Sequence, residues 1–179
     1  MSQDSVKPEA GAPGAPAVSL RPVEAADEPF LLAVYASARA AELAMVPWSD
    51  EQRLAFVRMQ FAAQTNHYRQ HYPAAEHSII EADGRAVGRV YVGRAPDAIT
   101  ILDVAVLPAE RGRGVGTKVV RALCAEAERA GRPVRIYVEN FNPSLRLFAR
   151  LGFEDAEDDG LNRLLVWRPE GARRNAERA

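Results

Sequence analysis

Cysteine is nearly absent from this chain of 179 residues, and the single one, Cys124, has no partner within the chain for a disulfide. It lies in a stretch with a helical pattern, where we expect a buried, inert apolar residue. The sequence also lacks any run of 18 apolar residues, and Asp4 and Glu9 lie near its start without an apolar run. We therefore expect no membrane-spanning helix and no signal peptide, and we predict a cytoplasmic location without membrane contact.

An excess of charge of one sign is missing as well. The 23 Lys and Arg residues balance the 24 Asp and Glu residues, which leaves a formal net charge of -1. The basic residues are spread along the chain, so no field large enough to bind nucleic acid is expected, and we predict no nucleic-acid partner. Any site for a phosphate group must then be built locally.

Apolar residues are present in ordinary amount, at 47% hydrophobic and 26% charged, which is typical of a globular protein. A chain of this length fits one domain with one core. Residues 1–16 are rich in Pro, Ala and Gly, and residues 169–179 are polar with several arginines, so we predict flexible tails at both ends. The folded domain is predicted to span residues 17–168.

The hydrophobic periodicity alternates between strand and helix in a regular order. Asp83-Gly84 and Asp159-Gly160 are typical of tight hairpin turns, and Ser49 with Gln52 predicts a capping box. The order predicts a mixed α/β (α+β) fold. The strands are expected at 18–23, 77–82, 85–92, 98–106, 134–138, 153–157 and 161–167, and the helices at 24–45, 51–71, 114–130 and 143–151.

A glycine-rich loop follows one of these strands and opens a helix. Gly112, Gly114 and Gly116 let the backbone approach a ligand closely, and the amides at a helix N-terminus attract anions. Arg111 and Arg113 add two cations whose donor geometry suits phosphate. The loop therefore predicts a pyrophosphate site.

Two known phosphate-binding motifs, and a loop without a ligand, are alternative interpretations of these glycines. A P-loop is excluded because Thr117 precedes Lys118, where that motif needs a glycine. The dinucleotide-binding fingerprint is closer, with Glu139 in the place of its ribose-binding acid, but Thr117 replaces its third glycine and the turn before the first glycine is too long. A glycine loop without any ligand stays open, because glycines also serve plain turns.

Two segments of the chain together indicate a family. Arg111, Gly114 and Gly116 follow a strand that ends at Val106 and Pro108, and residues 142–153 read NPSLRLFARLGF. In this order they resemble the two signatures of the GNAT superfamily of acetyl-CoA-dependent N-acetyltransferases, over about residues 17–168. The resemblance implies a mostly antiparallel sheet of about seven strands, with a V-shaped splay between the fourth and fifth, flanked by about four helices.

The resemblance also implies the chemistry. The protein would transfer the acetyl group of acetyl-CoA directly to a primary amine of a small molecule or peptide, without a metal, and such proteins often form homodimers. The amides of the glycine loop would hold the pyrophosphate, and the backbone of the preceding strand would pair with the pantetheine arm and stabilise the thioester oxygen. The residues that it implies for the cofactor are Val104, Ala105, Val106, Arg111, Gly112, Arg113, Gly114, Val115, Gly116, Thr117 and Asn142.

Acetyl transfer requires a neutral amine, and because a lysine-like amine titrates near ~10, a base or a water chain must remove its proton. Asp103 interrupts an apolar strand and is one candidate, and Glu139, at the end of the next strand, is the other. The alternative for Asp103 is a strand carboxylate paired with an arginine.

The proton donor that many GNAT proteins carry in the second signature is a tyrosine, and this chain has Phe148 in its place. A thiol with a pKa near ~8.5 can leave without help, so turnover remains compatible with the sequence. The alternative is a protein that binds or senses acyl-CoA without turnover.

The second helix carries polar residues on one face, which the family uses for acceptor specificity. We predict that Gln60, Gln64, His67 and Tyr68 form a wall of the acceptor pocket, and a solvated helix face is the alternative. His67 and His71 lack the carboxylate or cysteine that would complete a metal site. The acceptor itself stays open among a protein terminus, a lysine, a polyamine, an amino acid and a drug.

Overall fold

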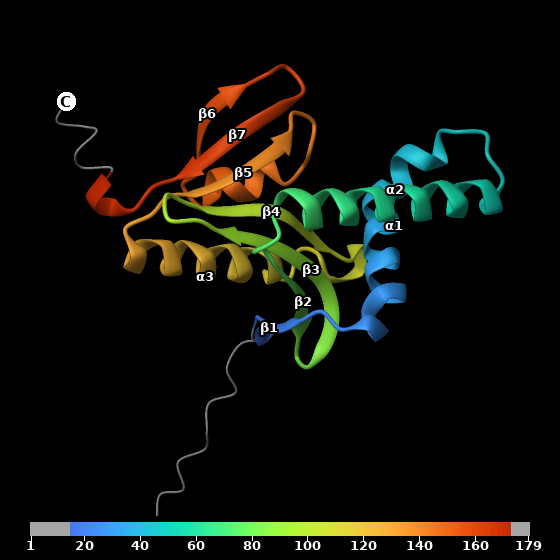
Figure 1. The fold of residues 1–179 in the computed structure, drawn as a ribbon, viewed down its shortest axis with the longest axis horizontal. Helices are drawn as coiled ribbons and strands as arrows, with labels where there is room; N and C mark the ends of the chain where they lie inside the picture. Colours follow the sequence, from blue (N-terminus) through green and yellow to red (C-terminus); the bar gives the residue numbers. More distant parts are fainter. Residues whose placement is uncertain (1–14, 173–179) are drawn as a thin grey trace, which may run out of the picture.

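The computed structural model describes residues 15–172. Of the predicted tails, residues 1–14 and 173–179 lie outside the described residues. The described part forms one seven-stranded sheet with four α-helices (Figure 1). In chain order the elements are β1 Val18–Pro22, η1 Ala25–Asp27, α1 Glu28–Ala44, α2 Asp50–His71, β2 Glu76–Ala82, β3 Arg85–Arg94, β4 Ile99–Val106, η2 Pro108–Glu110, α3 Val115–Ala130, β5 Val134–Glu139, α4 Leu145–Arg150, β6 Glu154–Asp158 and β7 Asn162–Trp167, where η marks a short 3-10 helix.

The sheet has the strand order β1-β2-β3-β4-β5-β7-β6, and every pair is antiparallel except β4 with β5. Helix α3 packs on one face of the sheet, and α1 with α2 packs on the other (Figure 1). The sheet thus has two hydrophobic cores, a first one beneath α3 and a second one beneath α1 and α2. Ile80 belongs to the first core and its neighbour Ile79 to the second, because successive side chains of a strand point to opposite faces. Cys124 on α3 is 8% exposed in the first core, as predicted.

The predicted local signals are largely confirmed. The side chains of Ser49 and Gln52 form the capping box of α2. Asp83 and Gly84 both have positive φ, at 50° and 76°, as a type I′ turn requires. In the hairpin of β6 and β7 only Gly160 has positive φ, and the carboxylate of Asp159 accepts the amides of Leu161 and Asn162, which forms a wider turn.

The first predicted helix, residues 24–45, is divided into η1 and α1. Pro29 lies in the first turn of α1, where its missing N–H costs nothing, so the α-helix begins there. Before it, the side chain of Asp27 accepts the amide of Glu24, which forms a capping box for the 3-10 turn.

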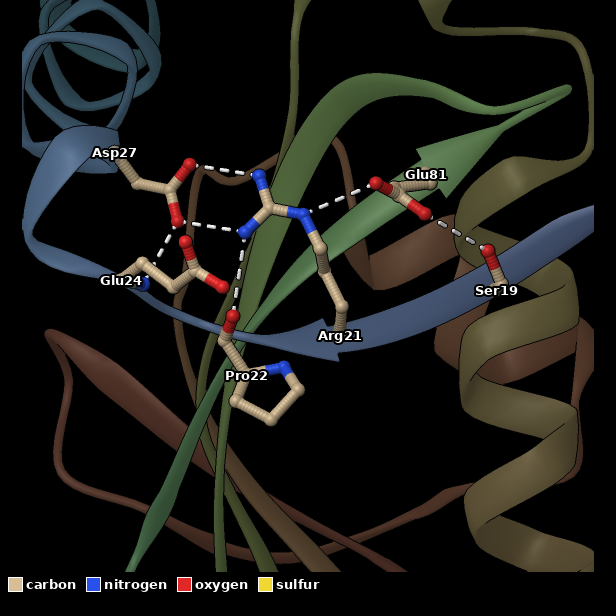
Figure 2. A network of polar contacts seen from close by, with 6 residues as sticks. All are labelled: Ser19, Arg21, Pro22, Glu24, Asp27 and Glu81. Atoms are coloured by element: carbon tan, nitrogen blue, oxygen red, sulfur yellow. Dashed lines mark hydrogen bonds and ion pairs between the residues drawn. The ribbon is translucent and has the colours of Figure 1, made fainter.

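A polar network ties the start of α1 to the edge of the sheet (Figure 2). Both terminal nitrogens of Arg21 donate to Asp27 at 2.7 Å, and its Nε donates to Glu81 at 3.0 Å. The hydrogen bonds from Arg21 lower the pKa of Asp27 to about 2. The network fixes the direction in which α1 leaves β1 and crosses the sheet.

The two parallel strands at the centre of the sheet separate after a short contact. Strand β4 pairs with β5 only from Ile99 to Ile101, opposite Val134 to Ile136. Beyond this point β4 continues beside β3 to Val106, and β5 continues beside β7 to Glu139. The predicted V-shaped splay between the fourth and fifth strands is therefore confirmed, and it opens at the end where β4 runs toward α3.

Candidate active site

Beyond Ile101, the β4 arm of the splay has backbone groups on its β5 side that no strand pairs with. The amide of Leu107 donates to Val87 on β3, and the carbonyl oxygen of Ala105 lies 2.3 Å from where a Cβ on Gly88 would be. Residues 105 and 107 therefore direct their backbone toward β3. Because backbone groups alternate along a strand, those of Val104 and Val106 are directed toward the splay.

The loop after β4 has the backbone that its glycines predict. Gly112 and Gly114 have φ of 75° and 83°, which only glycine adopts readily, so the fold itself requires both. Gly116 differs, because it lies in the first turn of α3 and a Cβ there would meet only Leu147 Cδ2, at an ordinary 3.5 Å. No side chain caps the N-terminus of α3, so its first amides are left for an anion.

The basic side chains of this loop are held by local partners. Arg111 Nε donates to the carbonyl oxygen of Val106 at 2.9 Å, and Arg113 forms an ion pair with Glu110. Lys118 Nζ donates to the carbonyl oxygens of residues 15 and 16 at 3.1 and 2.7 Å. A phosphate at the loop would compete with these contacts, most of which are exposed and therefore weak in water.

Asp103 lies on the β4 arm and its side chain is ion-paired. Its Oδ2 is 2.7 Å from Arg89 Nε, so the arginine pairing considered for Asp103 is present. Burial raises the pKa of Asp103 above its usual range, and the positive charge of Arg89 opposes that rise. The pKa of Asp103 thus depends on Arg89, a residue of the neighbouring strand β3.

Arg89 was not identified from the sequence. It is 4% exposed and is the one buried charged residue in the part of the chain that the structure describes. Its Nη2 donates to Gln64 Oε1 at 2.8 Å, and its Cζ lies 5.5 Å from the ring centre of Tyr35 and 5.6 Å from that of Phe61. The sequence did contain a signal for this pair. Arg89 and Asp103 have opposite charges, and each interrupts an apolar strand, β3 and β4, which follow one another in the chain.

The predicted polar face of α2 divides into two parts. Gln64 and Tyr68 turn toward the sheet, where Tyr68 donates its hydroxyl to the carbonyl oxygen of Leu102 at 3.0 Å. Burial raises the pKa of Tyr68 to about 12. Gln60 is half-buried, whereas His67 is exposed and stacks on His71 with 4.2 Å between ring centres. The structure thus brings Gln64 and Tyr68 to the β4 arm and leaves His67 facing solvent.

His77 on β2 is a second polar residue that the sequence did not single out. Its ring packs on Tyr91 at 4.6 Å, and its Nε2 is buried without a hydrogen-bond partner in the structure. Burial, helped by the positive charges of Arg89 and Arg69, lowers the pKa of His77 to about 4. His77 is therefore neutral at physiological pH.

The β5 arm carries the other candidate base and an apolar rim. Glu139 is exposed at the end of β5, opposite Asn162 of β7. Tyr137 and Phe141 beside it are 65% and 94% exposed. Asp103 and Glu139 thus lie on opposite arms of the splay.

The second signature forms the loop and helix after β5. The side-chain oxygen of Asn142 accepts the amide of Ser144 at 2.9 Å, so Asn142 helps to start α4. Phe148 is 0% exposed and its ring packs against Phe153 at 5.2 Å. The position of the usual tyrosine is therefore filled by a buried ring without a hydroxyl group.

Two further observations apply to residues 15–172. No group of three or more His, Cys, Asp or Glu side chains is arranged there to hold a metal ion. None of the helices there has the length and apolar character needed to cross a membrane.

Comparison with known proteins agrees with this geometry. Residues 38–153 match the acetyltransferase (GNAT) family. Mycothiol acetyltransferase of Nocardia farcinica (strain IFM 10152) is 35% identical over 89 residues, which are 48% of this chain and 28% of that protein. L-2,4-diaminobutyric acid acetyltransferase of the same organism is 47% identical over 49 residues, 25% of each protein. The matches thus span about a quarter of the length of these curated relatives.

The fold also has solved counterparts. The crystal structure of the PaiA N-acetyltransferase from Thermoplasma acidophilum, in complex with coenzyme A, superposes with a TM-score of 0.65 at 16% identity. The match covers 85% of this chain and 99% of that one. At this identity the likeness shows a common fold.

Proposed function

Because this chain belongs to the acetyltransferase (GNAT) family, we propose that it transfers the acetyl group of acetyl-CoA to a primary amine. The observation that carries the proposal is the splay between β4 and β5. It exposes backbone groups of β4, and the same strand leads into a glycine loop at an uncapped helix N-terminus. The backbone of β4 would suit a thioester, and the amides at the start of α3 would suit a pyrophosphate.

The residues on the cofactor side fit acetyl-CoA. The amides of Val104 and Val106 would pair with the pantetheine arm, and those of residues 111–117 would hold the pyrophosphate. Gly116 supports this role because packing does not require a glycine there, whereas close approach of a ligand does. Arg111 and Arg113 would supply positive charge. Ala105, whose backbone is directed toward β3, and Asn142, which starts α4, would contribute mainly by fixing this geometry.

On the acceptor side, the amine nitrogen would attack the thioester carbonyl carbon, and the carbon–sulfur bond would break to release the thiolate of coenzyme A. A base takes the proton that the amine loses, and that proton ends on the thiolate or in solvent. Asp103 and Glu139 are the two candidates for the base, one on each arm of the splay. Gln60, Gln64 and Tyr68 would contact the acceptor, with Gln64 and Tyr68 nearest to Asp103. His67, which faces solvent, would lie outside this wall.

We infer that the acceptor is a small molecule. The two curated relatives are named for mycothiol and for L-2,4-diaminobutyric acid, which are both small molecules. The acceptor-side polar groups are also few and partly buried, which suits a compact ligand more than an extended chain.

A second candidate is a protein that binds acyl-CoA without turnover, and Phe148 favours it. The ring is fully buried and offers no proton to a leaving thiolate. The two candidates share the cofactor site and differ only in the chemical step.

Calorimetric titration with acetyl-CoA, followed by a thiol-release assay against a panel of amino acids, polyamines and aminoglycosides, tests both candidates. Binding with thiol release for some amine supports the transferase. Binding without release for any amine supports the second candidate, and no binding at all would contradict both. Desulfo-coenzyme A, which cannot form a thioester, controls for binding without chemistry.

A further inference from the structure

Arg89 occupies a position where stability alone does not explain an arginine. It is 4% exposed on β3, in a run of six consecutive buried residues. Burying a charge is costly even when it is paired, and replacement of buried ion pairs by apolar residues is often neutral or stabilising. A charge in this place therefore suggests a use other than stability.

The contacts of Arg89 connect the two sides of the acceptor region. Nε faces Asp103 on β4 at 2.7 Å, and Nη2 donates to Gln64 on α2 at 2.8 Å. The guanidinium also lies against the rings of Tyr35 on α1 and Phe61 on α2. These rings leave it little freedom to turn. One side chain therefore forms an ion pair with a strand carboxylate, without a well-aligned hydrogen bond from Nε, and donates a hydrogen bond to the side-chain amide of a helix residue.

Asp103 lies just inside the splay. The last pair of β4 with β5 is Ile101 with Ile136, and Asp103 follows two residues later, next to the bulge at Leu102. A carboxylate held there is close to the backbone that would receive the thioester. We propose that Arg89 is a positioning residue, which holds the Asp103 carboxylate at the inner end of the splay and favours its ionised form. This role rests on the proposed function, because it concerns the acceptor amine of that reaction.

Other groups also act on Asp103. His77 is neutral and Tyr68 keeps its proton, so neither supplies a formal charge near neutral pH. Arg39 is partly exposed and shares an ion pair with Glu42 at 3.5 Å, so solvent screens it more than Arg89. The groups that face Asp103 or its immediate neighbours are Arg89 and Tyr91 from β3, Arg39 and Tyr35 from α1, Tyr68 from α2 and His77 from β2.

The test compares three variants. Arg89→Met removes the charge and keeps the length of the side chain. Arg89→Lys keeps the charge, although one ammonium group cannot replace the planar fork of donors that contacts both Asp103 and Gln64. The double variant Arg89→Met/Asp103→Asn removes both charges and leaves neither of them buried alone.

Two readouts report the state of Asp103. One is the acidic limb of the pH profile of kcat/KM with the best amine, and the other is the NMR titration of the Asp103 carboxyl carbon, which needs no turnover. In Arg89→Met we expect the midpoint of the acidic limb and the midpoint of the NMR titration to move upward by about 1 to 3 pH units, because an opposite charge at this distance is lost. In Arg89→Lys both should stay near their original pH, while the affinity for acetyl-CoA stays unchanged in all variants.

An Arg89→Met protein that is folded and binds acetyl-CoA, but whose limb and NMR titration do not move, would overturn the role of Arg89. If Arg89→Met does not fold, Arg89→Lys carries the test. The kcat/KM of Arg89→Lys should then fall by about tenfold or more, because lysine cannot contact Asp103 and Gln64 at the same time. An unchanged kcat/KM would overturn the positioning role of Arg89. If no amine is acetylated although acetyl-CoA binds, the proposed function fails, and the NMR titration still decides what Arg89 does to Asp103.

Discussion

At the scale of single residues, Gly116 separates ligand binding from folding. Its Cβ would meet nothing closer than Leu147 at 3.5 Å, and it lies inside α3, so Gly116→Ala should leave stability unchanged or raise it by up to about 1 kcal/mol. If the amides of this turn contact a pyrophosphate, the added methyl group should weaken acetyl-CoA binding by about tenfold or more, which is about 1.4 kcal/mol. Chemical denaturation and calorimetry measure the two effects.

Gly114→Ala is the matched variant for this experiment. Its φ of 83° strains any other residue, so it should lose about 1 to 2 kcal/mol of stability whatever the loop binds. Unchanged acetyl-CoA affinity in Gly116→Ala would favour a glycine loop that serves only as a turn.

His77 makes stability depend on pH. Its pKa is about 4 in the folded state, against about 6.5 in the unfolded chain, so below pH 6.5 the unfolded state takes up a proton that the folded state does not. The stability that the neutral ring preserves is fully present above pH 6.5 and is lost as the pH falls to 4. One pKa unit corresponds to about 1.4 kcal/mol, and partial exposure reduces the effect, so we expect a loss of about 1 to 2 kcal/mol.

Urea denaturation of His77→Phe between pH 7 and pH 4 checks this expectation. The variant keeps an aromatic ring against Tyr91 and should lose less stability over the range than the unaltered protein. His67→Phe removes an exposed histidine and controls for the loss of an imidazole as such. Equal slopes in His77→Phe and the unaltered protein would contradict the buried neutral histidine.

At the scale of elements, the contact between β3 and β4 depends on Gly88. A Cβ there would lie 2.3 Å from the carbonyl oxygen of Ala105, which is backbone and cannot turn away. Gly88→Ala should therefore destabilise the protein by about 1 to 3 kcal/mol, as overpacking does. It should also disturb β4 next to the splay.

Gly93→Ala in the same strand provides the control, because its nearest neighbour is the Thr100 carbonyl oxygen at 4.0 Å. Thermal or urea unfolding of the two variants should show a clear loss for Gly88→Ala and little change for Gly93→Ala. Similar stabilities would mean that the two strands relax apart without cost.

At the scale of the whole molecule, a ligand that spans the splay and the α3 N-terminus should stabilise the fold. At a concentration about 100 times its Kd, acetyl-CoA should add about 2.7 kcal/mol. For a domain of this size that corresponds to a rise in Tm of roughly 5 to 10 °C. NAD at the same concentration should cause no rise, and a rise with NAD alone would restore the dinucleotide-binding interpretation.

The features that the sequence by itself determined are those that depend on residues near one another in the chain. The element order, the Ser49 capping box, the Asp83-Gly84 turn and the end of α3 at Ala130 could all be predicted, because each follows from local backbone preferences. The two signature segments are also local, so the family and its splayed sheet could be predicted from them.

The tertiary structure alone decided which side chains meet. Arg89 reaches Gln64 across 25 positions and Asp103 across a strand pair, and His77 reaches Tyr91 through strand register. The polar face of α2 divides because only one side of the helix faces the sheet, which periodicity does not specify. Such contacts depend on strand pairing and helix orientation, which are set by the packing of the whole domain and not by local preference.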